Sequence, residues 1–159
     1  MLFRSYEDGD LVLFESGAIV LHIAERFPGL LPADANARAR AIAWMFAAVS
    51  DVEPLIVQRE VVEHAESDKS WATERMAMVE QRIRDRFAEL AAHLGGADWI
   101  DGAFSAADVL LVQALRRLEG QTPLTEFPTL VAYMEHGKAR PAFKRAFAAQ
   151  LAAYNETKD

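Results

Sequence analysis

The sequence predicts a mainly helical protein that begins with a short β-hairpin and one further helix. Three observations carry this prediction. Apolar residues recur with helical spacing through most of residues 37–155, two short apolar segments near the N-terminus flank an Asp-Gly turn, and prolines and a glycine interrupt the chain at 28–34. We therefore expect residues 1–29 and 37–155 to form separate parts, joined by a linker at 30–36.

The hairpin is expected from residues 1–6 and 11–14. Asp8-Gly9 lies between these segments, and an Asp-Gly pair with apolar flanks is a strong hairpin signal. A two-stranded hairpin is marginal by itself, so another surface has to cover its apolar residues.

A helix is expected directly after the second strand, from Ser16 to about Phe27. Ser16 can cap this helix by accepting a backbone N–H of the first turn. Two interpretations of Glu15 and Ser16 stay open at this point. The pair is either an ordinary helix start, or a site where the free N–H groups and the helix dipole favour an anionic ligand.

Two long helices are expected next, at 37–67 and 71–94. Pro54 should kink or interrupt the first of them, because proline lacks a backbone donor and clashes with the preceding turn. Gly95-Gly96 is a typical stop for the second. The connection between the helices is short, so they should pack antiparallel.

A buried helix is expected after residue 105. Ser105 and Asp108 have the spacing of a capping box, with Asp in place of the usual Glu. The segment 109–115 is apolar on nearly all sides, which is typical of a helix at the centre of a core. Further helices are expected at about 127–137 and 140–154, the first with Pro128 in its opening turn.

Composition narrows the classes of function. The net charge of −7 argues against a nucleic-acid partner and against an anionic membrane surface. The absence of cysteine excludes a disulfide, a thiolate metal site and a cysteine nucleophile within these residues, and it is compatible with a cytoplasmic location. The N-terminal residues lack the pattern of a signal peptide, and we expect no apolar run long enough to span a membrane.

The four histidines are scattered along the chain and predict no metal site. His22 and Glu25 lie three residues apart on one expected helix, but a pair of ligands is too few to define a site. The sequence also shows no Ser-His-Asp arrangement and no glycine-rich phosphate loop.

Five motifs, in this order, resemble those of bacterial cytosolic-type glutathione transferases. They are Glu-Ser-x-Ala-Ile at 15–19, Leu-x-Pro at 30–32, the interrupted helix around Asp51–Pro54, the Ser105–Asp108 box, and Pro-x-Leu at 128–130 followed by Arg-Pro-Ala-Phe at 140–143. The resemblance implies an all-helical C-terminal domain at 37–155, preceded by the last two strands and final helix of a thioredoxin-like domain at 1–29.

The resemblance also implies roles for particular residues. Glu15 and Ser16 correspond to the pair that holds the γ-glutamyl end of glutathione, which is a co-substrate in this family and not a cofactor. The first long helix borders the pocket for a hydrophobic electrophile, and its candidate residues are Trp44, Met45, Val49 and Val52. The other interpretation of these four residues is that they belong to the core or to a dimer contact.

The sequence departs from the family at its N-terminal end. It has no match to the first strands and helices of the thioredoxin-like domain, which in the family carry the residue that activates the glutathione sulfur. We therefore assign no catalytic residue and expect this truncated chain alone to conjugate weakly or not at all. An upstream start, with Met1 as an internal methionine, stays open.

The family is dimeric, so the resemblance implies a homodimer. The uncovered apolar surface of the hairpin is a second reason to expect self-association. The alternative function is a non-catalytic helical module for interaction or dimerisation. It is favoured by the missing sulfur-activating segment and disfavoured by the presence of Glu15 and Ser16.

Overall fold

The structure is a computed structural model that describes residues 5–156. It is mainly helical, with one small antiparallel sheet near the N-terminus, as the sequence predicts. The elements are β1 (Tyr6–Asp8), β2 (Leu11–Leu13), α1 (Ser16–Arg26), α2 (Ala35–Ala47), the π-helical η1 (Ala48–Val52), α3 (Glu53–Ala65), α4 (Ala72–Leu94), α5 (Ala106–Leu115), the 3-10 helices η2 (Arg116–Leu118) and η3 (Leu124–Glu126), α6 (Pro128–Ala139) and α7 (Pro141–Glu156).

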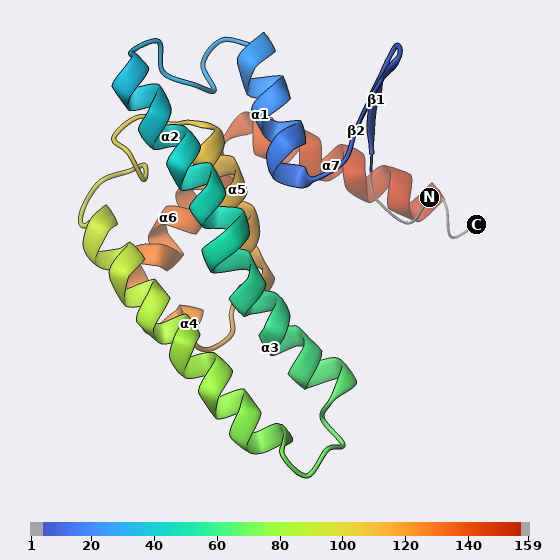
Figure 1. Cartoon of the computed structure of the whole chain (residues 1–159), viewed down its shortest axis with the longest axis vertical. Coiled ribbons are helices and arrows are strands. Elements are labelled where there is room, and N and C mark those ends of the chain that lie inside the picture. Colours follow the sequence, from blue (N-terminus) through green and yellow to red (C-terminus); the bar gives the residue numbers. More distant parts are fainter. Residues whose placement is uncertain (1–4, 157–159) are drawn as a thin grey trace.

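Helix α5 lies at the centre of the helical bundle. It contacts α1, α2, η1, α3 and α6, and nearly all of its side chains are buried. Figure 1 shows α2 continuing through a bend into α3, with α4 running alongside α3, while α1 and the hairpin lie at the opposite end. The predicted central helix and the predicted pairing of the two long helices are thereby confirmed.

The start of α5 is fixed by a buried carboxyl group. Asp108 is fully buried and accepts hydrogen bonds from the backbone N–H groups of Ser105 (2.8 Å) and Ile100 (2.9 Å). It also accepts from the hydroxyls of Ser105 (3.2 Å) and Tyr133 (2.7 Å). Burial is the main cause that raises the pKa of the Tyr133 hydroxyl, and the neighbouring Asp108 raises it further. Tyr133 therefore stays protonated and acts as a donor. The predicted capping box is confirmed, and it also binds α6 through Tyr133.

The predicted interruption of the first long helix is also confirmed. The last turn before Pro54 is widened into the π-helical segment η1, where the backbone N–H of Glu53 donates to the carbonyl of Ala48, five residues earlier. Because Pro54 has no N–H of its own, the regular i→i−4 ladder cannot continue unbroken through this point. The interruption lies where α2 passes into α3, and α3 packs against α4.

The combined helical run Ala35–Ala65 corrects one expectation from the sequence. By length and composition it could cross a membrane, so the statement that no apolar run has this length is wrong. Its buried side chains form a stripe at intervals of three and four residues, which is the pattern of a helix packed in a protein core. That stripe consists of Ala41, Met45, Ala48, Val52 and Ile56.

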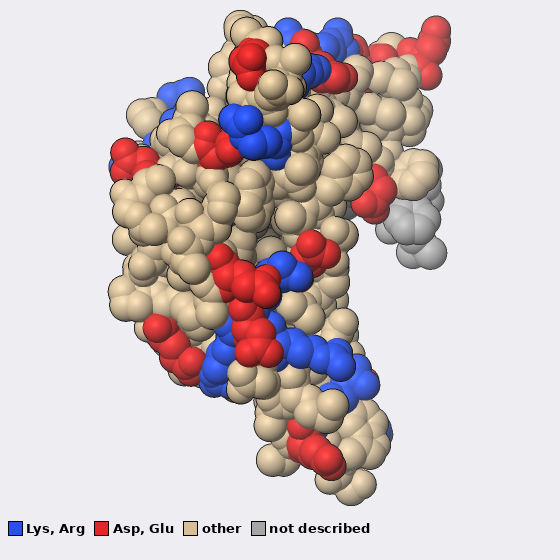
Figure 2. Space-filling model, turned by 60° about the vertical axis from the view of Figure 1, so that its left-hand side comes forward, with Lys and Arg blue, Asp and Glu red and all other residues tan. Residues whose placement is uncertain are grey.

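Ion pairs join α3, α4 and the segment that follows α5. Arg59, which is 8% exposed, donates to Glu63 at 2.8 Å and to Glu80 at 3.4 Å. Arg84 donates to Glu126 at 2.8 Å and also reaches Glu80. Figure 2 shows acidic and basic side chains interleaved on the lower part of this face. The charges therefore neutralise one another locally instead of forming a patch of one sign.

The hairpin pairs β1 with β2 in an antiparallel register, with Tyr6 opposite Leu13 and Asp8 opposite Leu11. Gly9, in the turn, has a φ of 61°, a left-handed conformation that glycine adopts without steric cost. The predicted hairpin is thus present, although residues 1–4 of its first strand lie outside the described residues. Val12 and Phe14 are 50% and 56% exposed, so much apolar surface at this end is uncovered.

The close approach of α5 and α6 at Gly137 yields a stability prediction. A Cβ added to Gly137 would lie 2.5 Å from the Val112 Cγ2 atom. We expect Gly137→Ala to lower the free energy of unfolding by about 1–3 kcal/mol, because overpacking outweighs the better helix propensity of alanine. Urea unfolding monitored by circular dichroism measures this change.

Gly96→Ala is the matched control, because a Cβ at Gly96 meets no atom within 4 Å and its φ is not left-handed. The control should leave the urea midpoint nearly unchanged. Equal midpoints for the parent and Gly137→Ala would show that α5 and α6 do not pack as closely as described.

Candidate functional site

The residues before α1 adopt an unusual backbone conformation. Glu15 is the N-cap of α1 and has φ 75° and ψ 115°, and no other residue among 5–156 except glycine has a positive φ. Such a conformation costs an L-residue on the order of 1–3 kcal/mol, and strained residues of this kind cluster at functional sites. This strain is the first reason to place the candidate site here.

The structure corrects the predicted role of Ser16. Ser16 is the first residue of α1, not its cap, and no side-chain hydrogen bond caps this helix. The first helical bond runs from the N–H of Ile19 to the carbonyl of Glu15, at 2.9 Å. The N–H groups ahead of Ile19 therefore have no acceptor within the helix, and Ser16, in this first turn, is exposed. This end of α1 can offer several donors to a carboxylate.

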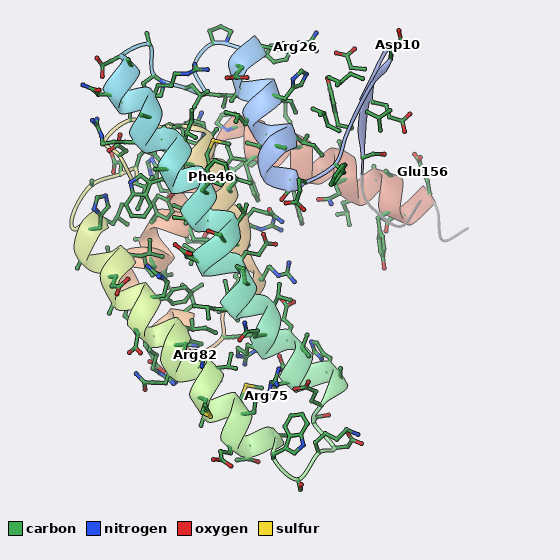
Figure 3. All side chains as sticks on the ribbon, in the orientation of Figure 1. Asp10, Arg26, Phe46, Arg75, Arg82 and Glu156 are labelled. Atoms are coloured by element: carbon green, nitrogen blue, oxygen red, sulfur yellow. The ribbon has the colours of Figure 1, made fainter. Side chains whose placement is uncertain are left out.

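A cleft of about 220 Å³ lies beside this helix start, between α1 and the α2–η1 run. Its lining residues are Glu15, Gly17, Ala18, Leu21, Ile42, Met45, Phe46 and Val49. Gly17 brings the two helices close, since a Cβ there would lie 3.6 Å from the methyl groups of Val49. Figure 3 labels Phe46 on α2. The cleft joins the polar end of α1 to an apolar wall.

The predicted pocket residues divide into two groups. Met45 and Val49 line the cleft together with Glu15. Trp44 does not line it; its ring lies 4.5 Å from that of His93, on α4. Val52 does not line it either, because it is 1% exposed within the core. Three of the six predicted site residues, Glu15, Met45 and Val49, thus line one cleft, and Ser16 follows Glu15 in the chain without lining it.

The site residues predicted from the sequence do not include three large apolar residues of the cleft, Leu21, Ile42 and Phe46, or the small residues Gly17 and Ala18. Among residues 5–156, Phe46 has the most exposed of the large apolar side chains, at 63%. Ile42, Met45, Phe46 and Val49 have the spacing i, i+3, i+4, i+7 of a single helical face. That pattern could have identified Ile42 and Phe46, whereas Leu21 comes from a different helix and depends on the tertiary structure.

A second cavity, of about 320 Å³, lies between the end of α4 and α6. It is lined by residues 95–98 and by Thr129, Ala132, Tyr133 and His136. The His136 ring packs against Trp99 at 4.5 Å, and the Tyr133 hydroxyl already binds Asp108. Within residues 5–156, no three His, Cys, Asp or Glu side chains converge as metal ligands would. This cavity is thus lined by one carboxylate, that of Asp98, and one imidazole, that of His136.

Comparison with known proteins identifies the family. The model of the glutathione S-transferase C-terminal domain matches residues 58–150. The chain is also 30% identical over 141 residues to the disulfide-bond oxidoreductase YfcG of Escherichia coli K12, a match that covers 86% of this chain and 63% of the relative. The chain belongs to the glutathione S-transferase family.

Solved structures agree with this assignment. A glutathione S-transferase from Xylella fastidiosa is similar with a TM-score of 0.81 and 26% identity, over 91% of this chain and 73% of the other. A family member from Pseudomonas fluorescens pf-5, solved with two glutathione bound, has a TM-score of 0.78 and 26% identity, over 85% of this chain and 63% of the other. The chain thus spans somewhat under two thirds of the length of several relatives.

The strain at Glu15 gives a prediction about stability. In a helix or strand, alanine normally gives a free energy of unfolding about 0.5–1 kcal/mol higher than glycine does, because glycine loses more backbone entropy on folding. At the positive φ of Glu15 this order should reverse, since alanine keeps the Cβ clash and glycine removes it. We expect Glu15→Gly to unfold at a higher urea concentration than Glu15→Ala.

The same pair of substitutions at Glu74, within α4, supplies the control, and there alanine should be the more stable. If alanine were also the more stable replacement at position 15, Glu15 would not be strained as described.

Proposed function

We propose that this chain carries the γ-glutamyl half of a glutathione site. In this proposal the glutathione α-carboxylate accepts hydrogen bonds from the Ser16 hydroxyl and from the free N–H groups of the first turn of α1. The glutathione α-ammonium pairs with the Glu15 carboxylate. The single observation that carries the proposal is the strained Glu15 directly before an uncapped helix start.

Relatives support the proposal without deciding it. The similar proteins from Pseudomonas fluorescens pf-5 and Burkholderia graminis were each solved with two glutathione molecules bound. They are 26% identical to this chain, which covers 63% and 62% of their lengths. Glutathione is bound in those proteins, which makes it the first ligand to test here.

In the complete protein, the proposed reaction is conjugation. The glutathione thiolate attacks a hydrophobic electrophile, a carbon–sulfur bond forms, and the leaving group departs with its electron pair. The cleft lined by Met45 and Val49 is the proposed place for that electrophile. Activation of the sulfur requires a nearby donor that lowers the thiol pKa. No described residue is assigned this task, so we propose little activity for the chain alone.

A second reaction follows from the name of the Escherichia coli relative. Reduction of a disulfide by two glutathione molecules yields two thiols and glutathione disulfide. This sequence contains no cysteine, so residues 1–159 themselves would supply no thiol to such an exchange between glutathione and its substrate. An assay of glutathione-dependent disulfide reduction should therefore accompany the conjugation assay.

The domain division is part of the same proposal. Residues 1–29 would belong to a thioredoxin-like domain, 30–36 to a linker, and 37–155 to the helical domain. The linker is attached to the helical part through a hydrogen bond of 2.7 Å from the N–H of Ala106 to the carbonyl of Leu30. The start of α5 thereby helps to fix where the first part lies.

We also propose that the protein forms a homodimer. Val12 and Phe14 are each at least half exposed, and exposed apolar surface of this kind is typical of interfaces. Sedimentation velocity should show a dimer at micromolar concentration, and Val12→Ser should shift the distribution towards monomer. A well-folded monomer at high concentration would contradict this.

Titration calorimetry with glutathione tests the proposed site. We expect saturable binding that Ser16→Ala weakens at least tenfold and Glu15→Gln weakens by a similar factor, because each removes one partner of a charged group. Ser67→Ala is the matched control, as this exposed serine lies in the loop between α3 and α4.

A folded chain that binds no glutathione would contradict the proposed function. Binding that persists unchanged in both variants would place glutathione elsewhere on the molecule.

A further inference from the structure

The cleft between α1 and α2 has one charged residue and otherwise apolar walls. Every lining residue except Glu15 is a glycine or carries an apolar side chain. Within residues 5–156, the Glu15 carboxylate has no ion-pair partner, whereas Glu25 on the same helix is paired with Arg38 at 2.7 Å. An unpaired carboxylate beside an apolar cleft favours a ligand that is itself both cationic and apolar.

The dimensions of the cleft limit the apolar part of such a ligand. A protein cavity of about 150 Å³ can hold one benzene molecule, so a cleft of about 220 Å³ has room for one ring and a short chain. Met45 is 3% exposed, and a thioether makes favourable contacts with aromatic rings. A fused or branched ring system would extend beyond these walls.

The electrostatics favour a positive charge at the rim. Phe46 is 63% exposed beside the cleft, and the face of an aromatic ring attracts ammonium groups. The net charge of −7 adds a long-range attraction for cations. An ammonium group placed between the Glu15 carboxylate and the Phe46 ring would form an ion pair with the first and a cation–π contact with the second.

We propose that this cleft binds a small arylalkylammonium ion, with its single ring between α1 and α2 and its ammonium at Glu15. The inference rests on the cleft and on Glu15 and stands independently of the proposed glutathione site. Because both ligands would use Glu15 for an ammonium group, glutathione and the arylalkylammonium ion should compete.

Methionine-methyl NMR provides a direct test. The full chain is labelled with [¹³C-methyl]methionine, and the Met45 signal is assigned from its loss in Met45→Leu. The probes are 2-phenylethylammonium chloride and the neutral 2-phenylethanol, both at pH 7, where an alkylamine is protonated. We expect a saturable shift of the Met45 methyl signal, with the ammonium probe bound at least tenfold more tightly than the alcohol.

Variants separate the contributions of charge and ring. Glu15→Gln should abolish the preference for the ammonium probe and leave the affinity for the alcohol unchanged. Phe46→Ala should weaken both probes. Glu74→Gln removes an equal charge from an exposed position on α4 and should change neither affinity.

Equal affinities for the two probes in the parent chain would overturn the proposal, as would the absence of any Met45 shift. An ammonium preference that survives in Glu15→Gln would overturn it as well. The proposed function fails separately: if glutathione neither binds nor displaces the ammonium probe while that probe still binds at Glu15, only the glutathione site is refuted.

Discussion

The buried carboxyl group of Asp108 is the interaction on which the rest of this structure depends. It accepts hydrogen bonds from four donors: two from Ser105, one from Ile100 and one from Tyr133. These donors come from the start of α5, from the preceding loop and from α6. Each donor is buried and would lose a hydrogen bond if the carboxyl were removed, at a cost of about 1–3 kcal/mol. One side chain therefore fixes how α5 enters the core.

The candidate site depends on this arrangement indirectly. Helices α1 and α2 both pack against α5, and the cleft lies between these two helices. The N–H of Ala106, in the first turn of α5, also holds the linker carbonyl of Leu30. The relative position of Glu15 and Met45 thus follows from where α5 begins, although neither residue touches Asp108.

Most of the helical fold could be predicted from the sequence because its signals are local. The capping box at Ser105, the break at Pro54 and the stop at Gly95 each depend on residues close together in the chain. The same is true of the Asp-Gly turn of the hairpin. Local rules failed where two explanations share one pattern, as with the run Ala35–Ala65, which by length and composition passes the test for a membrane span although a core helix can pass it too.

The candidate site could be predicted only in part. Glu15 and Ser16 were found through a motif, but the positive φ of Glu15 has no signature in the residue type. The sequence favours Ser16 as the cap because serine is common at that position, yet the N-cap residue of α1 is Glu15. Trp44 and Val52 lie on the same continuous helical run as Met45. Only the packing of α4 and α5 shows that these two side chains do not line the cleft.

The measurement that most directly tests this account is the stability of Asp108→Asn. Asparagine keeps the size of the side chain, but its NH₂ group must face donors that need an acceptor. Urea unfolding should show a loss of about 2–4 kcal/mol, while Asp98→Asn, at an exposed position in the same loop, should change stability by less than about 0.5 kcal/mol. A loss no larger for Asp108→Asn than for Asp98→Asn would contradict the central role of this carboxyl group.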